Sequence, residues 1–123
     1  MTPNVMLFID DDLVPEKERT HKETGLVFWI GPIDLKTQEE LLKAAREGKD
    51  KPGEYDGTLH NGLIVDKAVR RWKGVGMAGQ VAECNSANKL KFGARFSSIA
   101  DWIFAQATSP MLFAVEVELA KNA

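Results

Sequence analysis

The chain has 123 residues, of which 44% are hydrophobic and 28% are charged, and its net charge at pH 7 is -2. This length and balance predict one globular domain over residues 1–123, and the small negative charge gives no general attraction to nucleic acid or acidic membrane. The single cysteine excludes an internal disulfide framework. We expect a cytoplasmic protein, because no apolar run approaches the roughly 20 residues of a membrane helix and no signal peptide is recognisable.

The first part of the chain predicts a pair of strands within residues 5–31. Residues 5–9 (VMLFI) and 26–30 (LVFWI) are continuous apolar runs, and the charged segment 15–24 separates them. We therefore expect the two runs to pair as antiparallel strands, with the charged segment as an exposed loop or hairpin tip.

A helical body is expected over residues 37–121. Thr37 and Glu40 form a capping box, which predicts the start of a helix that Gly48 ends. The polar segment 49–57 contains a Pro-Gly pair and is typical of a turn.

The stretch from 63 to 84 predicts a helix followed by a short hairpin. Four apolar residues recur at the spacing of one helical face: Val65, Ala68, Val69 and Trp72. This spacing predicts a helix from about residue 59 to Trp72, closed by Gly74 in the left-handed conformation. The glycines that follow predict a hairpin near 75–84 that turns at Ala78–Gly79. The indole of Trp72 is expected to anchor this unit by packing against it.

The last third of the chain predicts further helices. Asn85 is expected to cap a short helix that Gly93 ends, and Ser97 or Ser98 to cap the next one. For residues 111–121 two readings remain: alternation favours a strand, whereas apolar spacing and the start signal Ser109-Pro110 favour a helix, which we prefer. Together the elements predict an α+β fold, in which a small antiparallel sheet from the N-terminal strands, with the hairpin as a further candidate, packs against four or five helices.

No pattern of residues predicts an active site, a cofactor site or a metal site. Asp10–Asp12 lack the alternating carboxylates and the glycine of a calcium-binding loop, so solvated charges at a strand end are the preferred interpretation. His21 and His60 have no second ligand at metal-binding spacing. Cys84 could act as a nucleophile only with a base that the sequence does not identify, and a structural thiol is preferred.

Two groups of residues are candidates for binding a protein partner. The first is the basic cluster around the central tryptophan: Arg70, Arg71, Trp72 and Lys73. Three cations in an acidic chain suit a solvated face or a partner's carboxylates better than nucleic acid. The second is the apolar run near the C-terminus: Met111, Leu112, Phe113 and Val115. This run is either core or a surface for self-association or for a client.

Several segments in their order resemble the tail assembly chaperones of long-tailed (siphophage-type) bacteriophages. Residues 69–75 (VRRWKGV) match the form V-x-x-W-x-G-V, and residues 29–41 look like the family's proline-containing turn and Glu-rich helix start. Residues 85–92 and 98–107 are similar to the two helical segments that follow. The resemblance extends from about Gly25 to Ala107 and departs from the family pattern at residues 77–82.

The resemblance implies a non-enzymatic protein that acts in the bacterial host cytoplasm without a cofactor. Its implied partners are the tape-measure protein, which it would coat, and the tail-tube protein, which it would recruit before the tail polymerises. Self-association is also expected, and neither nucleic acid nor membrane is an expected partner. The main alternative is a permanent virion component, such as a head–tail connector or a minor tail protein. An enzyme is the third alternative.

Overall fold

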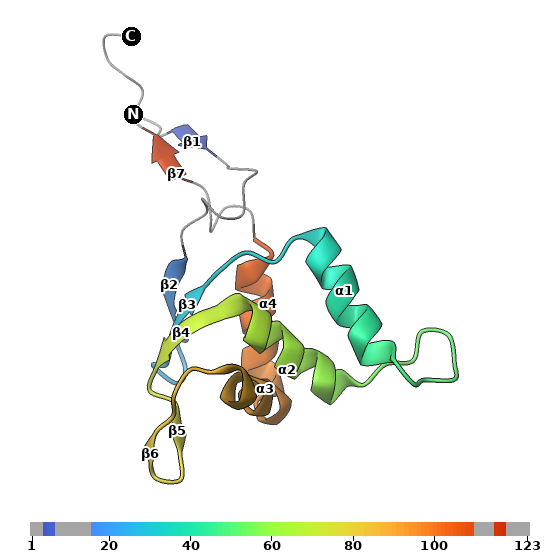
Figure 1. Ribbon diagram of the computed structural model, residues 1–123. Coiled ribbons are helices and arrows are strands. Elements are labelled where there is room, and N and C mark those ends of the chain that lie inside the picture. The colour runs from blue at the N-terminus through green and yellow to red at the C-terminus, as the bar shows by residue number, and fades with distance from the viewer. Residues whose placement is uncertain (1–3, 7–15, 110–114, 118–123) are drawn as a thin grey trace.

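The fold is described from a computed structural model, which covers residues 4–6, 16–109 and 115–117 (Figure 1). The strands are β1 (Asn4–Met6), β2 (Lys17–Thr20), β3 (Val27–Ile30), β4 (Val69–Lys73), β5 (Gly76–Met77), β6 (Gln80–Val81) and β7 (Val115–Val117). The helices are α1 (Leu35–Arg46), α2 (Gly57–Ala68), α3 (Ser86–Arg95) and α4 (Ser97–Ala107). In the described residues the strands form three antiparallel sheets, ordered β1-β7, β2-β3-β4 and β5-β6. The predicted α+β class is confirmed, and the described part of the chain holds small antiparallel sheets and four helices.

The sheet β2-β3-β4 carries a bulge that sets which residues face the helices. Phe28 lies opposite Trp72, whereas Ile30 lies opposite Val69, so β4 contains one more residue than β3 between these pairs. The extra residue is Arg70, and such a bulge lets the side chains on both sides of it point to the same face. Val69 and Trp72 therefore lie on the same face of the sheet as Phe28 and Ile30, which are fully buried.

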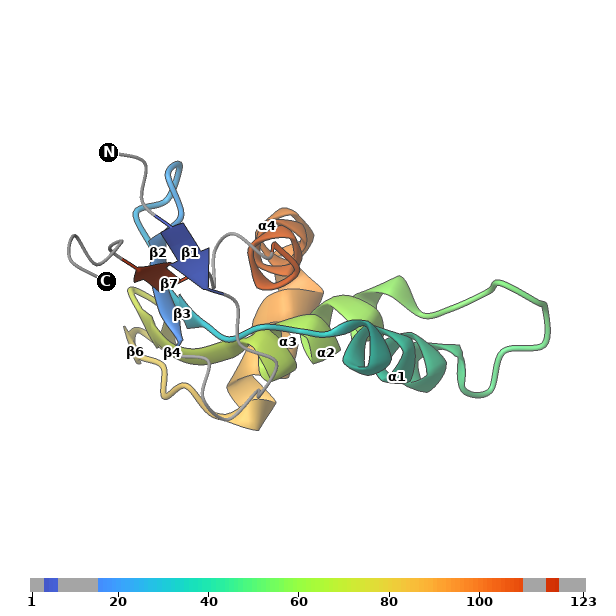
Figure 2. The ribbon, with the colours of Figure 1, turned by 90° about the horizontal axis from the view of Figure 1, so that it is seen from above.

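Helix α2 lies at the centre of the helical part, where it packs against α1, α3 and α4 (Figures 1 and 2). Helices α2 and α3 approach so closely that two glycines face each other: a side chain on Gly62 would lie 2.7 Å from the Leu90 carbonyl oxygen, and one on Gly93 would lie 2.7 Å from Gly62 Cα. The core joins the sheet to α2, α3 and α4 and consists of Phe28, Ile30, Ile33, Ile64, Val65, Ala68, Val69, Phe92, Ile99, Ala100, Ile103 and Ala107.

The predicted central helix ends earlier than the sequence indicated. Helix α2 stops at Ala68, and Val69–Lys73 form a strand, so the helix to Trp72 was wrong. The cause is the bulge at Arg70, because it gives Val69 and Trp72 the three-residue spacing that a helical face also has. Gly74 has the predicted positive φ, at 100°, but it follows a strand and does not close a helix. The hairpin turn at Ala78–Gly79 is confirmed.

The predicted pairing of the two N-terminal apolar runs is also wrong. In β1, Asn4 pairs with Val117 of β7, and β3 instead lies between β2 and β4. Strand β2 (KERT) falls inside the segment expected to be an exposed loop or hairpin tip, and of that segment only residues 21–24 belong to the tip between β2 and β3. The sequence does not predict β2 as a strand, because its side chains are charged or polar and lack an apolar pattern. An edge strand can form without apolar residues, since pairing of its backbone holds it in the sheet.

The helix starts agree with the sequence only in part. Asn85 caps α3 by accepting a hydrogen bond of 2.9 Å from the Asn88 amide, as predicted, but Gly93 lies inside that helix. The cap of α1 is Asp34 and not Thr37: its carboxylate accepts from the Thr37 amide at 2.8 Å, which lowers the pKa of Asp34. Helix α4 has no side-chain cap, so the predicted serine cap is wrong. Only Phe96 separates α3 from α4, which leaves no room for an extended capping serine.

The C-terminal helix favoured for residues 111–121 is contradicted where the structure describes that segment. Val115–Val117 form a strand that pairs with β1, which fits the alternating pattern Val-Glu-Val. The other residues of that segment, and Asp10–Asp12, lie outside the described residues. Among the helices that the structure describes, none combines the length and the apolar character needed to cross a bilayer.

Candidate protein-binding pocket

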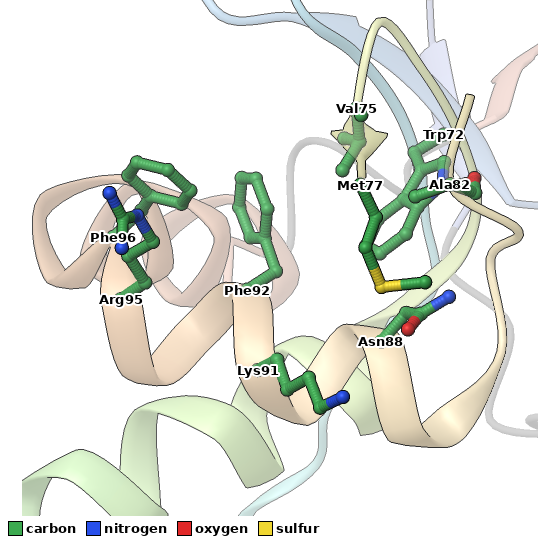
Figure 3. A pocket seen from close by; sticks show the side chains of 10 residues that line it. Trp72, Val75, Met77, Ala82, Asn88, Lys91, Phe92, Arg95 and Phe96 are labelled. Atoms are coloured by element: carbon green, nitrogen blue, oxygen red, sulfur yellow. Dashed lines mark hydrogen bonds between the residues drawn. The ribbon is translucent and has the colours of Figure 1, made fainter. Parts of the chain in front are cut away.

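An open apolar pocket lies between the β5-β6 hairpin and helix α3 (Figure 3). Its volume is about 170 Å³. We call it the hairpin pocket, and its lining residues are Trp72, Val75, Gly76, Met77, Ala82, Asn88, Lys91, Phe92, Arg95 and Phe96. The first five come from β4 and the hairpin, and the last five come from α3 or the residue after it. The pocket therefore exists only because these two parts of the chain are held beside each other.

One hydrogen bond ties the hairpin to β4, and two features of its backbone shape the hairpin itself. The Trp72 Nε1–H donates a hydrogen bond of 2.9 Å to the Ala82 carbonyl, and the Ala82 amide donates one of 2.9 Å to the Val75 carbonyl. At the far end, Ala78 and Gly79 have φ values of 53° and 75°. Positive φ at both central residues is the geometry of a tight two-residue hairpin turn. The hairpin thus leaves Met77 on the pocket side (Figure 3).

Aromatic rings form the floor of the pocket. The centre of the Phe92 ring lies 5.6 Å from that of Trp72 and 4.9 Å from that of Phe96. On its inner side Phe92 meets the fully buried Phe28, with ring centres 5.7 Å apart. These spacings are typical of interacting aromatic pairs. Phe92 is itself buried, whereas Phe96 is 41% exposed, so the aromatic floor runs from the core out to the surface.

The rim of the hairpin pocket is positively charged. Lys91 and Arg95 are exposed and lie four residues apart on α3, and none of the lining residues is acidic. The Arg95 guanidinium lies 5.6 Å from the centre of the Phe96 ring. Apolar surface continues beyond the pocket on the hairpin, where Met77 is 48% exposed and Val81 is 89% exposed. The pocket therefore combines an apolar centre with a basic edge.

Of the predicted binding residues that the structure describes, only Trp72 lines the hairpin pocket. Arg70, the bulge residue, packs its guanidinium beside Gly31, where any side chain at Gly31 would collide with it. The Arg71 guanidinium pairs with Glu16 and lies 4.7 Å from the centre of the Trp29 ring. Both arginines therefore have contacts within the molecule outside the hairpin pocket, while the Arg71 side chain is still 62% exposed.

The remaining predicted residues lie elsewhere. Lys73 is the exposed last residue of β4 and does not line the pocket. Val115 lies in β7, opposite Met6 of β1. Met111, Leu112 and Phe113 lie outside the described residues.

Four residues that line the pocket from the α3 side are not among the binding residues predicted from the sequence. They do carry a recognisable pattern, since residues 91–96 read KFGARF and place two cations and two phenylalanines in adjacent stripes four residues apart: Lys91, Phe92, Arg95 and Phe96. Residues four apart are neighbours on a helix surface. The start of this helix was predicted correctly from the sequence. The two cations beside two phenylalanines on its surface were therefore the signal from which this side of the pocket could have been predicted.

Other titratable groups lie away from the hairpin pocket. Burial lowers the pKa of His60, whose ring stacks edge-on against Tyr55 beside a second cavity of about 310 Å³. Burial also raises the pKa of the half-buried Cys84 thiol, which disfavours the thiolate that a nucleophile needs. Across the residues that the structure describes, no three His, Cys, Asp or Glu side chains gather as a metal-binding group.

The geometry of the hairpin pocket can thus serve to hold an apolar group next to a negative charge. The resemblance of residues 25–107 to tail assembly chaperones is carried by short sequence motifs, and it stays a prediction. No protein-family model, no curated protein and no solved structure matches the chain.

Proposed function

We propose that the protein is a tail assembly chaperone of a long-tailed bacteriophage or prophage. In this role it binds the tape-measure protein in the cytoplasm of the bacterial host, recruits tail-tube subunits and leaves when the tube has formed. It acts through protein–protein contacts, without a cofactor or a metal.

The observation that carries the proposal is the hairpin pocket beside Trp72. Its apolar floor and basic edge have the usual anatomy of a protein-binding patch, in which an apolar centre is surrounded by a polar rim. The motif V-x-x-W-x-G-V supplies both Trp72 and Val75, so two of the residues behind the family resemblance also line this pocket. A long helical tape-measure protein offers a fitting client, because its apolar stripe must be shielded until tube subunits cover it.

The proposal is tested by co-expressing the full chain with the tape-measure protein encoded near its gene. The expected result is that the tape-measure protein stays soluble and is captured together with the chain, and that tube protein joins this complex. Met77→Asp should weaken capture, because it puts a charge into the apolar pocket. Leu35→Asp is the matched control: Leu35 is 68% exposed on α1, away from the pocket, and its replacement should leave capture unchanged.

Two outcomes would overturn the proposal. In the first, neither client binds and the tape-measure protein is equally soluble alone. In the second, the chain is found in purified phage particles at a fixed ratio to the tail proteins. The second outcome would identify it as a permanent virion component, such as a head–tail connector or minor tail protein.

A further inference from the structure

We infer that the hairpin pocket holds one large apolar side chain from a helical partner segment, and that this segment carries carboxylates one turn apart beside that side chain. The inference names the chemistry of the partner and rests on the protein-binding function proposed above. It concerns Lys91 and Arg95, which differ from the basic residues that the sequence singled out.

The size of the pocket limits what can enter it. An apolar cavity of about 150 Å³ accommodates a single benzene-sized group. The hairpin pocket, at about 170 Å³, therefore has room for one phenylalanine, leucine or methionine side chain and not for two. Its floor consists of the rings of Trp72, Phe92 and Phe96. Such an apolar, aromatic floor suits an aromatic or branched aliphatic group.

The positive charges on the rim favour acidic residues next to that apolar side chain in the partner segment. Among the residues that the structure describes, Lys91 and Arg95 are the only charged ones that line the pocket. They are separated by about 6 Å along α3, because each residue advances a helix by about 1.5 Å. Two carboxylates one turn apart on a partner helix have the same spacing, so each can meet one cation. Arginine in particular can bind a carboxylate through two parallel hydrogen bonds.

The backbone around the pocket favours a helix over an added strand. Strands β5 and β6 have only two residues each, so their free outer edges are too short to hold an added strand, and α3 uses its backbone groups within the helix. A partner at this side of the pocket therefore meets mainly side chains. Recognition by side chains in a groove is the mode in which an amphipathic helix binds, with an apolar anchor set among charged neighbours.

The test uses three fluorescein-labelled peptides and the full-length protein, with fluorescence anisotropy as the readout. The acidic probe is an alanine- and glutamine-based helical peptide with one phenylalanine, flanked on the same face by two glutamates one turn apart. The basic probe has lysines in place of the glutamates, and the third probe has serine in place of the phenylalanine. We expect the acidic probe to bind at least tenfold more tightly than either of the others.

The double variant Lys91→Glu/Arg95→Glu should reverse this preference. It should lose at least tenfold in affinity for the acidic probe and gain affinity for the basic probe, a rescue that a merely unfolded variant could not give. Both positions are exposed, and the neutral pair Lys91→Gln/Arg95→Gln should give an intermediate affinity for the acidic probe. Arg70→Glu/Arg71→Glu is the matched control, because it makes the same change in net charge on β4, outside the pocket.

The inference is overturned if the acidic and basic probes bind equally, or if binding depends on Arg70 and Arg71 and not on Lys91 and Arg95. In that second case the chain could still capture the tape-measure protein, and the proposed function would stand without this site. Conversely, selective binding of the acidic probe with no capture of the tape-measure protein would support the site and reject the proposed function.

Discussion

Trp72 connects three parts of the molecule through one side chain. Trp72 pairs with Phe28 on the neighbouring strand β3, its ring lies beside Phe92 of α3, and its Nε1–H holds the hairpin through the Ala82 carbonyl. The ring is only half-buried, because one side of it lines the hairpin pocket. Its removal should therefore affect stability and the binding site together.

We predict that Trp72→Ala lowers the free energy of unfolding by on the order of 3 kcal/mol, as expected for deletion of a large, partly buried aromatic ring. Trp72→Phe keeps a ring beside Phe92 but loses the hydrogen bond to Ala82, and should cost about 1 kcal/mol from that bond. Urea denaturation followed by circular dichroism measures both values. An alanine variant within about 0.5 kcal/mol of the wild type would show that Trp72 does not anchor this unit.

Among the helices, strands and turns, the sequence predicted correctly those that are determined by residues within one short segment. The apolar run of β3, the asparagine cap of α3 and the turn of the hairpin each depend on residues within one short segment, and each was found. Strand β2 was missed because its stability comes from backbone pairing with β3 and not from its own side chains. Strand β4 was taken for helix because a bulge, which exists only when β4 meets β3, reproduces helical spacing.

The same distinction applies to the candidate site. The sequence identified Trp72 because tryptophan beside glycine and cations is conspicuous by itself. It could not identify the pocket, because Met77 and Phe96 come together only when the hairpin folds against α3. Nor could it show that Arg71 is engaged by Glu16, a residue 55 positions away in the chain.

The close crossing of α2 and α3 gives a prediction at the same scale. We expect Gly93→Ala to lower the free energy of unfolding by about 1–3 kcal/mol, because its methyl group would press on the backbone of α2 at Asn61 and Gly62. Gly57→Ala, at the start of α2, is the matched control, since nothing lies within 4 Å of its added methyl group. It should leave stability unchanged or raise it by up to about 1 kcal/mol. Equal effects of the two substitutions in thermal or urea denaturation would argue against the crossing.

For the whole molecule, we predict self-association at high concentration. The reason is exposed apolar surface on the hairpin, at Met77 and Val81, together with the apolar composition of residues 111–115. Under the proposed function, copies of the protein arrayed along a long client would also gain avidity from contacts with one another. Sedimentation velocity should show dimers or larger species that grow from micromolar to millimolar protein.

Two variants identify the surface involved. Met77→Ser/Val81→Ser tests the hairpin, and Met111→Ser/Phe113→Ser tests the segment that the sequence favoured. If one of these variants is monomeric, the residues that it changes lie in the contact between copies of the chain. A wild-type chain that sediments as a strict monomer over the whole range would contradict self-association.

The position of Phe92 has a consequence for how the protein would respond to its client. One side of this ring belongs to the core with Phe28, and the other side is the floor of the hairpin pocket. A group that binds only the folded form stabilises it, by about 2.7 kcal/mol when its concentration is 100 times the dissociation constant. Occupancy of the pocket would therefore protect the protein itself from heat. Under the proposed function, the form that has released its client would be the less stable one, more open to degradation once the tail is built.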